Sequence, residues 1–171
     1  MTPLGHVGWS VLLGMGLSRA LPGIDPKIII TATTIGGVAV DLDLLYRWYQ
    51  KGKDVFDKTI GQHRFFPSHT PLFLGSISLL IGFINLYWGL SLFIGAMGHL
   101  LLDTLFFPEG INFGWPITKN SVHLLIIKTH PFWAPKEVSN VDDWLKNYLT
   151  SPLFWIGEFI PTIIALTVLL S

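Results

Sequence analysis

Residues 87–107 read YWGLSLFIGAMGHLLLDTLFF, and this stretch decides the fold class. It is almost entirely apolar, and its single formal charge is Asp103. It reaches the roughly 20 residues that a helix needs to cross a hydrocarbon core. The whole chain of 171 residues is 50% hydrophobic and only 13% charged, whereas a soluble domain carries roughly 25% charged residues. The sequence therefore predicts a membrane protein and disfavours a soluble enzyme.

Four further apolar stretches complete the predicted architecture, an all-α integral membrane protein with about five transmembrane helices in one domain over residues 1–171. The helices are expected over residues 3–20, 26–48, 70–86, 87–107 and 152–170. In the second, the pair Gly36 and Gly37 would let a neighbouring helix approach closely. The third and fourth are joined so closely that they must form an antiparallel hairpin.

Residues 108–151, between the fourth and fifth helices, are rich in Pro, Trp, Phe and Lys. They are too polar to span the membrane and too aromatic for a disordered linker, so we expect an interfacial cap. Aromatic residues are typical of the membrane interface. We expect residues 112–133 to lie along the cytoplasmic interface, where their aromatic residues either shape an entrance to a site in the bundle or only anchor the protein; these are Phe113, Trp115, Phe132 and Trp133.

The Lys and Arg residues of the connections predict the orientation, because these residues are retained on the cytoplasmic side. The connection after the first helix contains only Arg19 and Lys27. The other two basic segments hold Arg47, Lys51, Lys53, Lys58 and Arg64, and then Lys119, Lys128, Lys136 and Lys146. This asymmetry predicts a multi-pass protein of the cytoplasmic (inner) membrane. Its N-terminus and the cap would be cytoplasmic and its C-terminus outside.

Net charge and cysteine content narrow the possible partners. Lys+Arg and Asp+Glu both number 11, which leaves no excess positive charge for a phosphate backbone. We therefore expect membrane lipids as partners and no nucleic acid. The chain has no cysteine, so any metal must be held by histidine and carboxylate side chains.

Ionisable residues in predicted spans are costly and are candidates for function. With alternating helix directions, the candidates all fall on the cytoplasmic side. His99 and Asp103 are four residues apart, which puts them on one face of a helix. Asp41 and Asp43 are two residues apart, so either the helix ends there or only one of them faces the site. The full set is His6, Asp41, Asp43, His63, His69, His99 and Asp103.

Structural roles compete with these functional ones. An intramembrane His or Asp can serve as a hydrogen-bonding group between helices. Asp41 and Asp43 can equally form a solvated helix end. His6 and His63 are either ligands or surface histidines in contact with water.

Four other polar residues stay open in the same way. His123 and His130 have no carboxylate at a ligand spacing, which favours a surface role. Glu158, near the start of the fifth helix, is a possible partner for a ligand histidine. Arg64 is either a membrane-surface charge or the group that holds an anionic substrate.

The order of these motifs resembles that of a known family. The chain is similar to the bacterial and archaeal membrane-bound metal-dependent hydrolases, some labelled LexA-binding, inner-membrane-associated hydrolases. In that family His-Arg is followed closely by Gly-x-Thr-His-Ser, a pattern from which residues 65–70, FFPSHT, depart. The resemblance covers residues 5–117 and is carried by His6, Asp41-Leu-Asp43, His63-Arg64, Ser68-His69-Thr70, Gly98-His99 with Asp103, and Gly114-Trp115-Pro116.

The resemblance implies metal-dependent hydrolysis. A mixed histidine and carboxylate set suits zinc, with manganese or iron as alternatives, better than magnesium. Seven candidate ligands leave room for one or two ions. The expected substrate is a lipid-like ester or phosphoester at the cytoplasmic leaflet. The expected metal ligands are His6, Asp41, His69, His99 and Asp103, and the expected catalytic residues are Asp43, His63 and Arg64, with Arg64 contacting the anionic group.

Three other functions fit the sequence. The metal site could be structural, or the basic loop over residues 47–64 could make the protein a scaffold for a soluble partner. A lesser alternative is a metal-free phospho-histidine lipid phosphatase, suggested by Pro67-Ser68-His69 and by the His99 and Asp103 pair. The Lys-x6-Arg-Pro element of those phosphatases is missing here.

Overall fold

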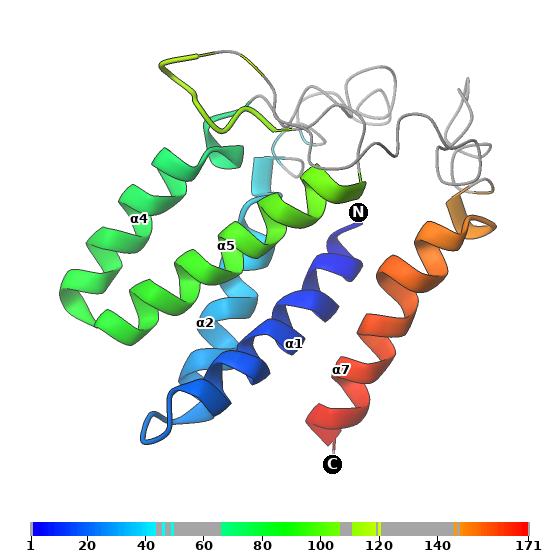
Figure 1. Ribbon diagram of the computed structural model, residues 1–171, viewed down its shortest axis with the longest axis horizontal. Helices are drawn as coiled ribbons and strands as arrows, with labels where there is room; N and C mark the ends of the chain where they lie inside the picture. The colour runs from blue at the N-terminus through cyan, green and yellow to red at the C-terminus, as the bar shows by residue number, and fades with distance from the viewer. Residues whose placement is uncertain are drawn as a thin grey trace.

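The computed structural model describes residues 2–43, 46, 49, 66–106, 111–118, 120, 146 and 148–170. In these residues the regular elements are all helical and there is no strand, which confirms the predicted all-α class. The bundle consists of α1 (Pro3–Ala20), α2 (Pro26–Ala39), α4 (Pro71–Ile84), α5 (Leu86–Phe106) and α7 (Ile160–Leu170) (Figure 1). Two short segments precede helices, the 3-10 turn η3 (Pro67–His69) before α4 and the π-helical η5 (Leu153–Phe159) before α7.

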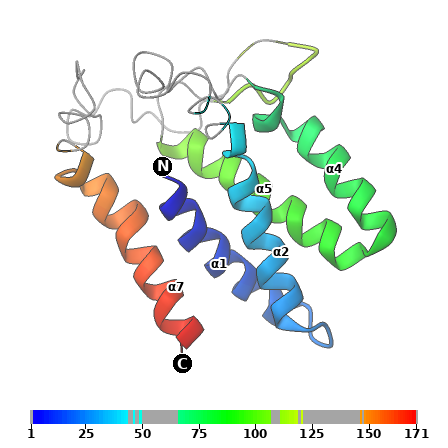
Figure 2. The same ribbon diagram turned by 180° about the vertical axis from the view of Figure 1, so that it is seen from behind.

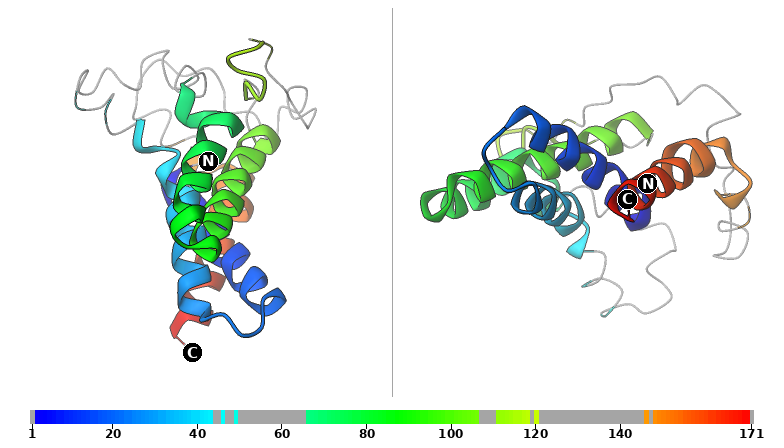
Figure 3. Two further views of the ribbon diagram at one scale, coloured as in Figure 1. Left: turned by 90° about the vertical axis from the view of Figure 1, so that its left-hand side faces the viewer. Right: turned by 90° about the horizontal axis from the view of Figure 1, so that it is seen from below.

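The helices pack side by side with alternating direction. α2 contacts both α1 and α5 in the middle of the bundle, while α4 packs on α5 and α7 packs on α1. Seen from behind and from below, α4 and α7 lie on opposite sides of this centre (Figures 2 and 3). The start of α1, the end of α2, the start of α4 and the end of α5 share one end of the bundle (Figure 1). We call this end the N-terminal end, and it carries the candidate residues.

Local capping explains where α4 and α5 begin. The Thr70 hydroxyl donates to the Pro67 carbonyl at 2.7 Å and accepts from the Phe73 N–H at 3.4 Å, so it caps α4. Asn85 alone connects α4 to α5, and its side-chain oxygen accepts from the N–H groups of Tyr87 and Trp88. The predicted antiparallel hairpin is confirmed.

Close backbone approach holds α2 against α1 and α5. A Cβ added at Gly36 would overlap the Leu92 carbonyl oxygen, and one at Gly95 would overlap the Thr33 carbonyl oxygen. A Cβ at Gly37 would overlap the hydroxyl of Ser10 on α1. The expected close approach at the paired glycines is therefore confirmed, as is usual where membrane helices meet.

A turn interrupts the predicted second helix, and the described residues beyond it, Leu42, Asp43, Tyr46 and Tyr49, are helical again. One continuous helix over residues 26–48 is wrong, because α2 ends at Ala39 and a turn follows at Val40 and Asp41. The Asp41 N–H donates to the Val38 carbonyl at 3.1 Å, three residues back instead of four. Val40 is fully buried in the core against Leu100. Packing of Val40 and the contacts of Asp41 decide this end, since no Pro or Gly interrupts the sequence there.

The outer surface of the bundle is apolar. Large side chains at the end of α4, including Leu80 and Phe83, are more than 60% exposed, and Leu170 of α7 is 86% exposed. Such a surface suits lipid better than water. Among the described helices, Leu86–Leu105 is long and apolar enough to cross a membrane, with 20 residues and a mean hydropathy of 1.3. The other apolar helices are shorter, so five spans stay a prediction.

Residues 111–118, the longest described stretch of the predicted cap, pack on the bundle. Ile111 is fully buried against Val40 and Leu100, which are the chain neighbours of Asp41 and His99. Phe113 packs on the same core. This segment therefore lies close to the N-terminal end, where the candidate residues are. Phe132 and Trp133 lie outside the described residues.

Candidate metal centre

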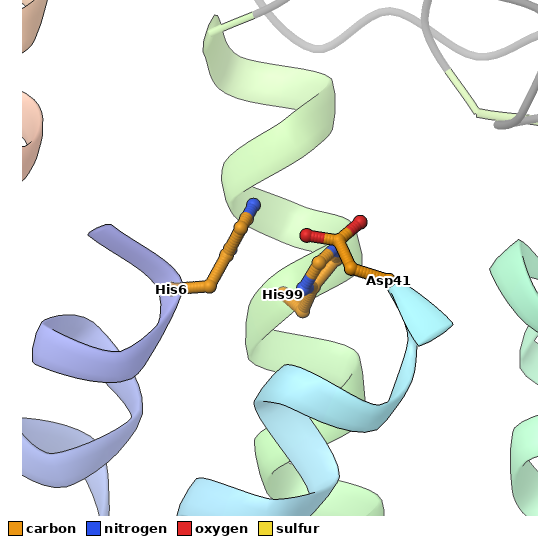
Figure 4. A group of neighbouring side chains, drawn as sticks. All are labelled: His6, Asp41 and His99. Atoms are coloured by element: carbon orange, nitrogen blue, oxygen red, sulfur yellow. The ribbon is translucent and has the colours of Figure 1, made fainter. Parts of the chain in front are cut away.

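Six of the residues singled out in the sequence meet at the N-terminal end of the bundle. Figure 4 shows His6 of α1, Asp41 beyond α2 and His99 of α5 pointing toward one another. His69 ends the turn η3, Asp43 follows Asp41, and Asp103 lies one turn after His99. We call these six residues the His/Asp cluster. His63, Arg64, His123 and His130 lie outside the described residues.

Imidazoles and carboxylates alternate through the His/Asp cluster. His6 Nε2 lies 3.3 Å from Asp103 Oδ1, and Asp103 Oδ2 lies 3.7 Å from His99 Nε2. His99 Nε2 lies 3.5 Å from Asp41 Oδ1, which is also 3.5 Å from His69 Nε2. His69 Nδ1 in turn lies 3.8 Å from Asp43 Oδ2.

These separations fit shared ligation of a cation better than direct hydrogen bonds. An N–H···O hydrogen bond spans roughly 2.7–3.2 Å, which is shorter than all five distances. Around a tetrahedral ion with bonds of about 2.0–2.1 Å, neighbouring ligand atoms lie about 3.3–3.4 Å apart. Three ring nitrogens make no hydrogen bond with any part of the chain that the structure describes, namely Nδ1 and Nε2 of His6 and Nε2 of His99. The donor atoms are thus spaced as ligands would be.

One backbone contact sets the orientation of His99. Its Nδ1 lies 2.6 Å from the carbonyl oxygen of Gly37 and donates a hydrogen bond to it. Because a neutral imidazole carries a single N–H, the lone pair then resides on Nε2, which faces Asp41 and Asp103. Ligand histidines in metal sites are commonly oriented in this way.

His69 is placed by the turn η3. Its N–H donates to the Phe66 carbonyl at 3.0 Å, and the Thr70 cap holds the other end of the turn. The Ser68 hydroxyl lies 3.2 Å from His69 Nδ1. The turn therefore directs the His69 ring into the bundle, where it is fully buried.

Burial makes the charge of the cluster costly. The side chains of all six residues are 8% exposed or less. Carboxylates removed from water lose several kcal/mol of hydration each unless positive charge compensates them. Three carboxylates and three neutral imidazoles carry a total charge of −3, so a divalent cation would compensate two of these charges, and the donor types suit such an ion.

Comparison with known families identifies the chain. The model of the YdjM inner membrane protein family matches residues 1–170. The chain belongs to the YdjM inner membrane protein family. No curated protein and no solved structure matches it. Membership in the YdjM family supports a location in the bacterial inner membrane. The family description names no activity and no metal, so both remain proposals for the His/Asp cluster.

The sequence offered Glu158 as a possible partner for a ligand histidine. In this YdjM-family chain, the described hydrogen bonds of Glu158 are instead to the N-terminus of α1 and to Tyr148. The fully buried carboxylate accepts from the Thr2 N–H at 2.5 Å and also from the hydroxyls of Thr2 and Tyr148. The Trp9 indole N–H donates to the Gly157 carbonyl at 2.7 Å. Both contacts join the π-helical segment to the first turns of α1. Glu158 thereby fixes the turn that carries His6, and among the residues that the structure describes its hydrogen bonds are to Thr2 and Tyr148 and not to a histidine.

Two parts of the site were missed by sequence reasoning. The Gly37 carbonyl orients His99, and the Ser68 hydroxyl contacts His69. A backbone carbonyl leaves no mark in a sequence, although the paired glycines did indicate where α5 approaches α2. Ser68 is adjacent to His69, and its contact with the His69 ring depends on the conformation of the η3 turn, which the sequence spacing does not determine.

Proposed function

We propose that this protein is a metal-dependent hydrolase of the inner membrane that cleaves an ester or phosphoester of a lipid-like substrate at the cytoplasmic leaflet. The alternation of imidazole nitrogens and carboxylate oxygens at 3.3–3.8 Å in the His/Asp cluster carries this proposal. A divalent ion there would supply Lewis acidity toward an ester or phosphoryl oxygen. Zinc suits the donor set, with manganese or iron as alternatives.

The residues divide into two proposed roles. His6, Asp41, His69, His99 and Asp103 would hold the ion. The proposed catalytic residues are Asp43 and His63, as proton donor or acceptor, and Arg64, which would contact the anionic group of the substrate. His63 and Arg64 lie outside the described residues, in the basic connection before η3.

Two observations support a lipid-like substrate. The chain belongs to an inner membrane family, and the outer faces of α4 and α7 expose large apolar side chains. The His/Asp cluster also lies at one end of the bundle rather than at its middle (Figure 1). A site at this depth would meet the ester and phosphate groups of a lipid before its acyl chains.

The Lys and Arg asymmetry supports a cytoplasmic N-terminus, and with it a cytoplasmic position for the cluster. Reporter fusions at Asp54 and after Ser171 are expected to report cytoplasm and exterior, respectively. Two reporters fused separately at each point would measure this, an alkaline phosphatase that is active only outside the cytoplasm and a fluorescent protein that is fluorescent only inside it. Identical signals at the two points would contradict five spans and the cytoplasmic placement of the site.

Hydrolysis is tested with the purified chain in vesicles of phosphatidylethanolamine and phosphatidylglycerol loaded with Zn²⁺ or Mn²⁺. We expect mass spectrometry to detect released fatty acid or phosphorylated headgroup. A chelator should abolish this release, and Asp103→Asn should lower its rate at least about 100-fold. Asp25→Asn is the matched control, because Asp25 caps α2 at the other end of the bundle. Turnover in the control should equal that of the unmodified chain.

One observation favours a second function, a structural metal site. The cluster is almost completely enclosed, and structural sites are closed whereas catalytic sites keep an open position. Under this alternative, metal would bind stoichiometrically and raise the unfolding temperature, and none of the lipids would be cleaved. That result would overturn the proposed hydrolase while leaving the metal centre in place.

A further inference from the structure

The two ring nitrogens of His69 face different surroundings. Nε2 lies 3.5 Å from Asp41 Oδ1. Nδ1 lies 3.2 Å from the Ser68 hydroxyl and 3.8 Å from Asp43 Oδ2. A neutral imidazole has one lone pair and one N–H. One side of this ring can therefore bind a cation while the other donates a hydrogen bond.

The environment of His99 decides how many ions the cluster holds. The cluster contains two sets of three residues whose donor atoms all lie within 4.8 Å of one another. One set is His6, Asp41 and His99, and the other is His69, His99 and Asp103. His99 belongs to both sets, and its Nδ1 donates to a backbone carbonyl. Its only lone pair, on Nε2, binds one ion. Both sets must then surround the same ion, which takes up the lone pair of His69 as well.

The contacts of Asp41 agree with this count. The same oxygen, Oδ1, faces both His69 Nε2 and His99 Nε2 at 3.5 Å. A carboxylate that bridges two ions commonly offers one oxygen to each. A third donor set, Asp41 with Asp43 and His69, would suit a second ion, but the His69 lone pair is already committed. Its Nδ1 then faces the Ser68 hydroxyl at 3.2 Å and, at 3.8 Å, the carboxylate of Asp43, which attracts the N–H electrostatically and not through a direct hydrogen bond.

We infer that the His/Asp cluster is a one-ion site with five ligands, His6, Asp41, His69, His99 and Asp103, in which Asp43 and Ser68 are positioning residues that hold the His69 ring. The inference rests on the proposed metal centre. It adds a positioning role for Asp43 to the proton transfer proposed above. Five protein ligands exceed the four of a tetrahedral zinc ion, so the ion would need a higher coordination number, and little room would remain on it for substrate.

Metal stoichiometry and affinity test this assignment without any activity assay. The full chain is purified in detergent, saturated with Zn²⁺ and analysed for metal per chain by mass spectrometry, and affinity is measured by competition with a chelating dye. We expect one ion per chain in the unmodified protein and in Asp43→Asn. Affinity should fall roughly 10- to 100-fold in Asp43→Ala. It should fall less in Asp43→Asn, because the amide oxygen keeps part of the electrostatic attraction for the Nδ1–H and fills the same space beside the ring.

Ser68→Ala and Asp25→Ala complete the series. The first removes the nearer partner of His69 Nδ1 and should also weaken affinity, while the second removes a carboxylate remote from the cluster and should not. Two ions in the unmodified chain with one in Asp43→Asn would overturn the inference and leave the metal centre standing. Unchanged affinity in both Asp43→Ala and Ser68→Ala would also overturn it. No metal in the unmodified chain would instead overturn the proposed function itself.

Discussion

His99→Ala is expected to abolish stoichiometric metal binding. His99 Nε2 is the atom that lies next to both Asp41 and Asp103, at 3.5 and 3.7 Å. Its loss removes a proposed ligand and leaves two buried carboxylates without the imidazole between them. Zn²⁺ affinity should fall by at least about 100-fold, beyond the effect of residues that only orient a ligand. Elemental analysis and chelator competition on the purified chain measure the loss.

Two further variants make this result interpretable. Leu101→Ala, on the same helix but 47% exposed, should keep its metal and serves as the control. His99→Gln keeps a polar side chain of similar length and guards against misfolding of the alanine variant. A full complement of metal in both His99 variants would show that His99 is not a ligand.

Gly95→Ala is expected to have the largest effect on stability. The new Cβ would overlap the Thr33 carbonyl oxygen and lie 3.0 Å from the Gly37 backbone nitrogen. Because both obstacles are backbone, no side chain can rotate away and α5 must move off α2. Unfolding free energy should fall by about 3 kcal/mol, the upper end of the range for overpacked sites. Thermal unfolding in detergent, followed by circular dichroism, measures it.

Gly16→Ala is the matched control, since no atom lies within 4 Å of the Cβ it would add. There the better helix propensity of alanine, about 1 kcal/mol over glycine, should leave stability equal or higher. Gly95→Ala should also weaken metal binding, because any shift of α5 from α2 separates His99 from the Gly37 carbonyl. Equal unfolding temperatures for the two variants would contradict the close packing of α2 and α5.

Local chemistry determined much of the fold in advance. The bounds of α1 are those predicted, because a proline starts the helix and Leu21-Pro22-Gly23 stops it. The cap by Thr70 and the hairpin at Asn85 also follow from nearby residues. The spacing of His99 and Asp103 fixes their common face by helix geometry alone. These features depend on contacts within a few residues along the chain.

Tertiary contacts decided the rest of the candidate site. The end of α2 at Ala39 has no sequence signal, yet it allows Asp41 and Asp43 to approach His69 together. The Gly37 carbonyl takes up the N–H of a histidine 62 positions away, and Glu158 takes up Thr2 from 156 positions away. Periodicity predicts which residues share a face of one helix. Only the packing of separate helices brings a hydrogen-bond donor on one helix to an acceptor on another. The sequence by itself therefore determined the types of the candidate ligand residues, and the tertiary structure decided their orientation.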